Sequence, residues 1–149
     1  MSHRMALVLF TVATLGIGLL IGSVSAPDQW YQALAKPAFN PPPWVFPPVW
    51  TALYLMVGVA GWRAWRLPER TLLRIWFVQM ALNFAWTPSF FLLHNIALAL
   101  GVIVLLLIAV LAFIAQAFSR DRIAAWLFVP YAVWVAFATL LTFTIWRLN

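Results

Sequence analysis

Residues 96–117 read IALALGVIVLLLIAVLAFIAQA, and no charged side chain interrupts this run. An α-helix needs roughly 20 mostly apolar residues to cross the hydrocarbon core of a bilayer, so the run predicts a membrane-spanning helix. The rest of the chain has the same character, because 66% of its 149 residues are hydrophobic and 8% are charged. Soluble domains carry about 25% charged residues. The sequence therefore predicts a helical integral membrane protein with no room for a separate soluble domain.

Four more apolar runs flank this one, separated by polar turns or by a proline-rich segment. We therefore expect an all-α fold, an integral membrane bundle of five transmembrane helices that forms a single domain over residues 1–149. The spans are predicted at about residues 5–25, 46–65, 72–93, 96–117 and 123–146. The first run ends in small residues and so also resembles a secretory signal peptide. It is longer than the roughly 7 to 15 apolar residues of such a peptide, which favours a retained helix.

One connection is long, and its residues 27–44 read PDQWYQALAKPAFNPPPW. Its prolines exclude a continuous helix, because proline has no backbone N–H and clashes inside a helix. Ser25 and Asp28 can cap a short helical turn through Leu34, after which an extended backbone is expected. The segment is too aromatic for a solvated linker. We expect it either to lie at the headgroup level or to fold over a cavity mouth as a lid.

The basic residues lie at the ends of the apolar runs and indicate the topology. With five spans the termini lie on opposite sides of the membrane, and the basic residues divide seven to two. The larger group is Arg4, Arg63, Arg66, Arg70, Arg74, Arg120 and Arg122, and the smaller group is Lys36 and Arg147. The positive-inside rule then predicts a cytoplasmic N-terminus, with residues 27–44 and the C-terminus on the opposite side. Because the net charge of +6 has this distribution, no nucleic-acid partner is expected.

The predicted spans carry no carboxylate, since Asp28, Glu69 and Asp121 all fall in connections. Ion pumps and proton-coupled transporters use ionisable groups at membrane depth, so coupling to ions is not expected. The same absence argues against a hydrolase, which needs paired carboxylates or a Ser-His-Asp set. The chain has no cysteine, and its two histidines, His3 and His94, lie near span ends. No metal site is therefore expected.

Aromatic and polar side chains recur at helical spacing within three of the spans. Phe46, Trp50 and Tyr54 repeat every four residues and share one face. A second face comprises Gln79, Asn83, Trp86, Thr87 and Phe90, and a third comprises Tyr131, Trp134, Ala138 and Leu141 or Thr142. These faces are either helix-packing surfaces or the walls of a cavity. Converging rings pack poorly without something between them, and buried tryptophan N–H groups need partners, which favours a cavity for a flat hydrophobic molecule.

Three groups of motifs carry a family resemblance. The first is Trp30-Tyr31, Lys36-Pro37, Pro41-Pro42, Trp44-Val45-Phe46 and Pro48-Val49-Trp50 with Leu53-Tyr54. The second is Asn83-Phe84-Ala85-Trp86-Thr87-Pro88 with Phe90-Phe91, and the third is Pro130-Tyr131 with Trp134, Ala138-Thr139 and Trp146-Arg147. In these stretches the chain resembles the TspO/MBR family, also called the translocator protein or peripheral benzodiazepine receptor family, whose bacterial members are tryptophan-rich sensory proteins.

The resemblance implies a membrane receptor or translocator, usually a homodimer, that binds porphyrins such as protoporphyrin IX for tetrapyrrole transport or sensing. The ligand site would lie beneath the segment that joins the first two long helices. Carried over by motif, the ligand-binding residues are Tyr31, Phe46, Trp50, Tyr54, Asn83, Trp86, Phe90, Trp134 and Ala138. No further cofactor is implied. The cavity faces offer no His or Cys as an axial iron ligand, which favours metal-free porphyrin over haem.

Two alternatives to transport or sensing stay open. The resemblance also suggests light- or oxygen-dependent porphyrin breakdown, in which Trp50 and Trp134 would be redox-active neighbours of the ligand rather than acid–base catalysts. The other alternative is a regulatory membrane protein whose ligand alters its association with a second protein. Sterol binding is not expected, because the family's proposed cholesterol motif needs a Tyr where this chain has Phe143 before Arg147.

Overall fold

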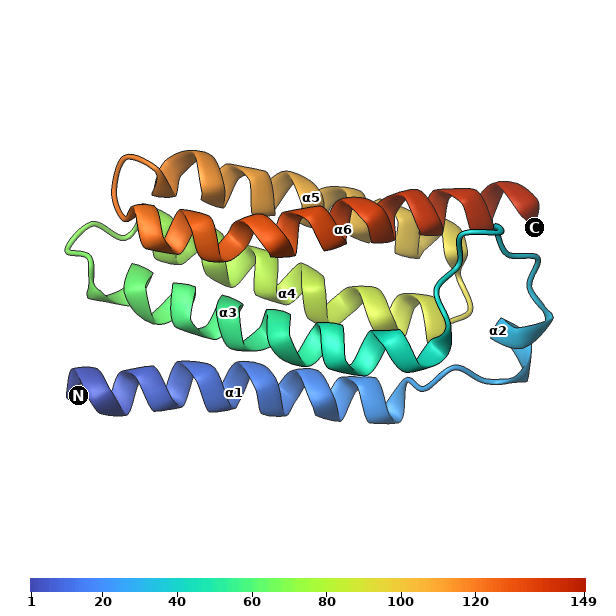
Figure 1. The fold of residues 1–149 in the computed structure, drawn as a ribbon, viewed down its shortest axis with the longest axis horizontal. Coiled ribbons are helices and arrows are strands. Elements are labelled where there is room, and N and C mark those ends of the chain that lie inside the picture. Colours follow the sequence, from blue (N-terminus) through green and yellow to red (C-terminus); the bar gives the residue numbers. More distant parts are fainter.

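The computed structural model describes all 149 residues and contains only helices and connecting segments. The helices are α1 (His3–Val24), α2 (Gln29–Ala33), the short 3-10 helix η1 (Pro43–Val45), α3 (Phe46–Arg66), α4 (Thr71–Phe91), α5 (Ile96–Ala117) and α6 (Arg122–Leu148). The long helices lie side by side, and the two termini lie at opposite ends of the bundle (Figure 1). The all-α membrane class predicted from the sequence is confirmed.

The predicted bundle of five transmembrane helices is wrong. The structure has six α-helices, and four candidate spans are long and apolar enough to cross a membrane: α1, η1 together with α3, α5 and α6. The sixth α-helix is α2, a single short helix in the long connection. α4 has 21 residues but does not reach the apolar character of a span, because it carries Arg74, Gln79 and Asn83 among other polar side chains.

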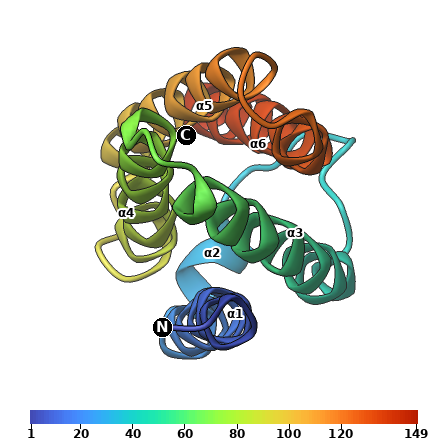
Figure 2. The ribbon, with the colours of Figure 1, turned by 90° about the vertical axis from the view of Figure 1, so that its left-hand side faces the viewer.

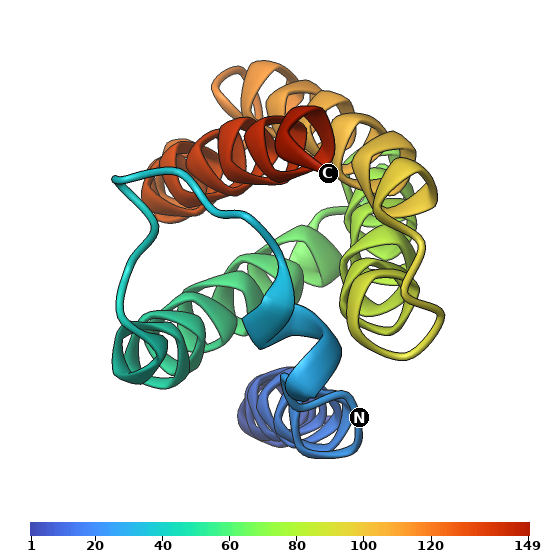
Figure 3. The same ribbon diagram turned by 90° about the vertical axis from the view of Figure 1, so that its right-hand side faces the viewer.

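The helices form layers that are visible when the bundle is viewed end on. α5 and α6 lie on one side, α3 and α4 lie in the middle, and α1 lies at the opposite edge (Figures 2 and 3). The rings of Phe113 on α5 and Phe128 on α6 are stacked with their centroids 3.9 Å apart, and both side chains are fully buried. Stacked rings of this size contribute a large buried apolar area, so this pair holds α5 against α6 within the core.

α1 approaches α3 through a glycine. A Cβ atom added to Gly58 of α3 would lie 2.9 Å from the Cα atom of Thr11 and 3.2 Å from the carbonyl oxygen of Phe10. Neither neighbour can rotate away, because both atoms belong to the backbone of α1. Small residues at such crossings let membrane helices approach closely, and Gly58 therefore sets the distance between α1 and α3.

Ion pairs close the end of the bundle that holds the N-terminus. Arg63 at the end of α3 binds Asp121 at the start of α6 with an N–O distance of 3.0 Å, and Arg120 binds Glu69 at 2.7 Å. Hydrogen bonds from Thr71 and then from Arg120 lower the pKa of Glu69 to about 2. Both ion pairs connect the region of the α3–α4 turn to the region of the α5–α6 turn. They therefore stabilise this end of the bundle, and the long connection lies at the opposite end (Figure 1).

We predict that Gly58→Ala destabilises the fold. The added methyl group must displace the α1 backbone, and overpacking of this kind costs roughly 1 to 3 kcal/mol. Gly101→Ala on α5 is the matched control, because a Cβ atom there meets nothing within 4 Å. Thermal unfolding in detergent, followed by circular dichroism, should show a lower Tm for Gly58→Ala alone. Equal Tm values for the two variants would contradict the close approach of α1 to α3.

Candidate functional site

A cavity of about 390 Å³ lies between α1, α3 and α4 and is roofed by the lid segment, which we define as residues 27–44. Its wall comprises Gly18, Leu19, Gly22, Ser23, Ser25, Pro27, Tyr31, Pro43, Phe46, Pro47, Trp50, Tyr54, Trp86, Thr87 and Phe91. Small-molecule sites in proteins are mostly apolar clefts of about 300 to 1,000 Å³ with a few polar groups. The cavity has the size and the lining of such a site.

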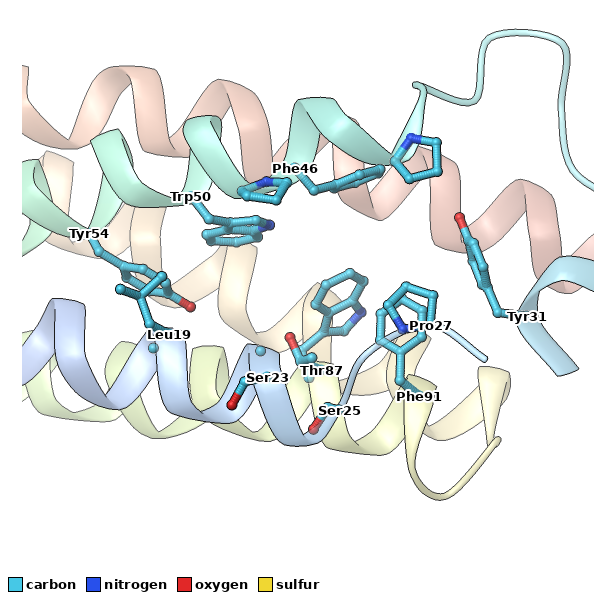
Figure 4. Close-up of a pocket in the computed structure, with 15 residues that line it drawn as sticks. Leu19, Ser23, Ser25, Pro27, Tyr31, Phe46, Trp50, Tyr54, Thr87 and Phe91 are labelled. Atoms are coloured by element: carbon cyan, nitrogen blue, oxygen red, sulfur yellow. The ribbon is translucent and has the colours of Figure 1, made fainter. Parts of the chain in front are cut away.

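α3 contributes an aromatic face to the cavity. Phe46, Trp50 and Tyr54 follow each other at steps of four residues and therefore lie on one side of the helix. The rings of Trp50 and Tyr54 are stacked, with centroids 5.4 Å apart and an interplanar angle of 29°. Figure 4 shows these rings along one side of the cavity and Leu19 and Ser23 of α1 on the other. The cavity thus has an aromatic wall on α3 opposite a stretch of α1 whose lining side chains are small or aliphatic.

The lid segment is held over the cavity at its first end by Asp28 and His94. The Asp28 carboxylate accepts a hydrogen bond of 3.2 Å from the backbone N–H of Tyr31 and so caps the start of α2. The same carboxylate lies 3.0 Å from His94 Nε2. The Trp30 ring stacks on the His94 ring with centroids 4.3 Å apart. The hydrogen bond from Tyr31, together with His94, lowers the pKa of Asp28. These contacts orient α2 so that Tyr31 faces the cavity (Figure 4).

A second contact holds the other end of α2. The side-chain amide of Asn149 donates to the carbonyl oxygen of Ala35 at 2.9 Å and accepts from the Ala35 N–H at 3.1 Å. Figure 3 shows the lid segment crossing the end of the bundle beside the C-terminus. Because the pair uses both polar groups of the Ala35 backbone, the part of the lid segment that follows α2 is fixed to the end of α6.

A chain of three hydrogen bonds lies deeper in the bundle, at the inner end of the cavity. The Tyr54 hydroxyl donates to Asn83 Oδ1 at 2.9 Å, Asn83 Nδ2 donates to the Tyr131 hydroxyl at 2.7 Å, and that hydroxyl donates to Gln79 Oε1 at 2.8 Å. Asn83, Gln79 and Tyr131 are all buried. The chain joins α3, α4 and α6, and it fixes the edge of the Tyr54 ring that faces the cavity.

The structure divides the nine residues expected at the ligand site into two groups. Those that line the cavity are Tyr31, Phe46, Trp50, Tyr54 and Trp86. Those that do not line it are Asn83, Phe90, Trp134 and Ala138. Asn83 is occupied by the hydrogen-bond chain, Phe90 packs against Tyr31 and Trp30 of the lid segment, and Ala138 of α6 lies in the core. α6 therefore contributes no side chain to the cavity wall.

Trp134 lies on the opposite side of Trp50 from the cavity. The two rings meet edge to face with centroids 6.3 Å apart. Trp134 also lines a shallow groove between α3 and α6, together with Val49, Leu53 and Val133. Of these two rings, only Trp50 lines the cavity, and Trp134 packs against Trp50 without lining it.

The wall contributed by α1 was not expected from the sequence. Gly18, Leu19, Gly22 and Ser23 line the cavity, although α1 has no aromatic or polar stripe of the kind found on α3 and α4. The GxxxG step formed by Gly18 and Gly22 was the one available signal, because small residues on one face allow a neighbour to come close. A Cβ atom on Gly18 would clash with the ring of Tyr54, so that ring lies directly on the α1 backbone.

The sequence matches one family model and several known proteins over most of its length. The family model described as the TspO/MBR family matches residues 7–147. A tryptophan-rich sensory protein of Cereibacter sphaeroides is 39% identical and the match covers 100% of this chain and 95% of that protein. Protein CrtK of Rhodobacter capsulatus is also 39% identical, over 86% of this chain and 83% of that protein. The translocator protein of Homo sapiens is 34% identical, over 94% and 88% of the two chains.

The buried hydrogen-bond chain generates a stability prediction. Tyr131→Phe leaves both Asn83 Nδ2 and Gln79 Oε1 without their partner, whereas Tyr54→Phe frees Asn83 Oδ1 alone. A buried polar group left unpaired costs roughly 1 to 3 kcal/mol. We therefore expect Tyr131→Phe to lower the Tm about twice as much as Tyr54→Phe in thermal unfolding experiments in detergent. A Tyr131→Phe variant as stable as wild type would show that the chain does not stabilise the bundle.

The contacts of Asp28 predict a pH dependence of the lid segment. The lowered pKa of Asp28 means that the folded lid favours the carboxylate. Its stabilising contribution is therefore present above the ordinary pKa of about 3.9 and is lost as the pH falls through the lowered value. Hydrogen exchange of the amides of residues 29–34, corrected for the intrinsic rate at each pH, should be slower in wild type than in Asp28→Ala at pH 6.

That difference in protection should shrink as the pH falls through the lowered pKa of Asp28, because the carboxyl group becomes protonated there. Gln29→Ala is the control, since the Gln29 side chain is exposed and neutral. Protection that is the same in wild type and in Asp28→Ala at pH 6 would show that Asp28 does not hold α2 in place.

Proposed function

Because this chain belongs to the TspO/MBR family, we propose that it binds a porphyrin, or a similarly flat hydrophobic ring, in the cavity beneath the lid segment. Binding would serve tetrapyrrole transport or sensing. The observation that carries the proposal is the cavity itself, about 390 Å³ in volume and walled by the aromatic rings of α3, α4 and the lid segment.

The aromatic wall supports a flat ligand rather than a chain-like one. The rings of Trp50 and Tyr54, which stack on each other, both line the cavity, and Trp86 and Phe91 of α4 line it as well. Aromatic rings gain about 0.5 to 1.5 kcal/mol from a well-placed aromatic partner, beyond the roughly 25 cal/mol per Å² that burial of apolar area contributes. A planar conjugated ligand obtains both contributions in this cavity.

Two residues of the cavity wall each hold an unpaired polar atom. Ser25 Oγ and Trp86 Nε1 are buried and have no hydrogen-bond partner within the protein, and both residues line the cavity. An unpaired buried polar group is costly, and a ligand that reaches these atoms through a small side-chain movement would give them a partner. A porphyrin offers both ring nitrogens and carboxylate oxygens to atoms of this kind.

The carboxylates of a porphyrin would need to lie at the water-facing mouth of the cavity. No basic side chain lines the cavity. Lys36 is the one basic residue of the lid segment, and its ammonium group donates to the carbonyl oxygens of Gln32 and Leu34 and lies 4.5 Å from the centroid of the Tyr31 ring. We place the ligand with its ring system against Trp50 and its carboxylates toward Lys36.

The same proposal includes an orientation in the membrane. The arginine-rich turns between α3 and α4 and between α5 and α6 lie at the end of the bundle that holds the N-terminus (Figure 1). Positively charged connections favour the cytoplasmic side. The N-terminus would then be cytoplasmic, and the lid segment would face the opposite compartment, from which the ligand would enter.

We predict that Trp50→Ala weakens porphyrin binding by about tenfold or more, which corresponds to roughly 1.4 kcal/mol of lost contact with the ring. Titration of the detergent-solubilised protein with protoporphyrin IX, followed by quenching of tryptophan fluorescence, measures the affinity. Trp126→Ala is the matched control, because Trp126 lies on α6 with 63% of its surface exposed and away from the cavity. Equal affinities for wild type and Trp50→Ala would remove the cavity as the porphyrin site.

A further inference from the structure

α1 and α3 run in opposite directions along the cavity, so their residues meet in a fixed register (Figure 1). In antiparallel helices, a step of four residues forward along one corresponds to a step of four residues back along the other. Gly18 of α1 lies against the Tyr54 ring of α3. One turn closer to the lid segment, the same register places Gly22 opposite Trp50, and both residues line the cavity.

The two glycines form notches in the surface of α1, but only one of the notches is filled. A Cβ atom on Gly18 would clash with the Tyr54 ring, whereas a Cβ atom on Gly22 would meet nothing within 4 Å. The absence of a side chain lets a ring lie directly on the helix backbone, as the Tyr54 ring does at Gly18. At Gly22 the corresponding space belongs to the cavity.

We propose that Gly22 and Trp50 form a slot that admits one edge of a planar ring system, and that the missing side chain at position 22 determines how wide a ligand the cavity accepts. This inference rests on the proposed function and assigns a specificity-determining residue to it. The ligand ring in the slot takes the place at Gly22 that the Tyr54 ring takes at Gly18. It stacks on Trp50 as Tyr54 does from the other side.

A side chain at position 22 would therefore occupy space that the ligand needs, without contacting other protein atoms. The open space around Gly22 accommodates a larger side chain without displacing a neighbour. The fold should tolerate the substitution. The new side chain would, however, fill part of the slot and leave less room for the ligand ring. This separates Gly22 from Gly18 and Gly58, where any side chain meets protein atoms.

The test compares Gly22→Ala and Gly22→Val with Gly16→Ala and Gly16→Val. Gly16 lies on the same helix, also has open space around it and does not line the cavity. We expect Gly22→Val to lower the affinity for protoporphyrin IX by about tenfold or more and Gly22→Ala by about threefold, because each added methyl group enters a packed contact. Both Gly16 variants should bind as wild type does, and all four should unfold at similar temperatures.

A chemical readout uses the absence of native cysteine. Gly22→Cys and Gly16→Cys each place one thiol in the protein, and its reaction with N-ethylmaleimide can be followed with and without protoporphyrin IX. The slot predicts that the porphyrin slows labelling at position 22 severalfold and leaves labelling at position 16 unchanged.

The outcomes distinguish the slot from the proposed function. If Trp50→Ala loses affinity while Gly22→Val does not, and the thiol at position 22 reacts equally with and without ligand, the slot is wrong and the cavity remains the binding site. If wild type does not bind protoporphyrin IX at all, the proposed function fails and the slot fails with it. Loss of binding in both Gly22→Val and Gly16→Val would also overturn the slot, since a general effect on α1 would then explain it.

Discussion

The hydrogen bonds from Tyr54 through Asn83 and Tyr131 to Gln79 are the constraint on which the rest of the structure depends. In a bilayer no water is available to polar side chains, so leaving one without a partner in the protein is costly. Asn83 and Gln79 therefore point α4 inward, toward the tyrosines of α3 and α6. This arrangement explains why α4 is too polar to qualify as a span by composition and why it still lies within the bundle.

The cavity follows from the same arrangement. The hydrogen bond from Tyr54 to Asn83 holds α3 against α4 at the inner end of the cavity, and the lid segment covers its outer end. Tyr54 belongs to both features, since its hydroxyl group joins the chain and its ring lines the cavity and rests on Gly18. The lid segment is held by polar contacts, of Asp28 with His94 near its start and of Ala35 with Asn149 near its middle, and by the rings of Trp30 and Tyr31 against Phe90. Contacts of this kind can break without unfolding the bundle, which suits a roof over a ligand site.

The sequence predicted the all-α membrane class and the family correctly, because apolar runs of bilayer length and long tryptophan-rich motifs are strong signals. The number of spans was wrong, since hydrophobic length alone does not reveal that the polar side chains of α4 are used inside the bundle. The spacing of Phe46, Trp50 and Tyr54 predicted which face of α3 lines the cavity, but it did not predict which helix lies opposite that face. The covering helix is α1, whose contribution at Gly22 is the lack of a side chain, and Trp134 of α6 lies behind Trp50 instead.

The most direct measurement is an experimental structure of the protein in lipid with protoporphyrin IX bound. The assignment of the cavity predicts density for the ring system between α1 and α3, in contact with Trp50 and beneath Tyr31, with the carboxylates toward the lid segment. Density for the porphyrin elsewhere on the bundle, such as the outer groove between α3 and α6, with side chains filling the space below the lid segment, would contradict it.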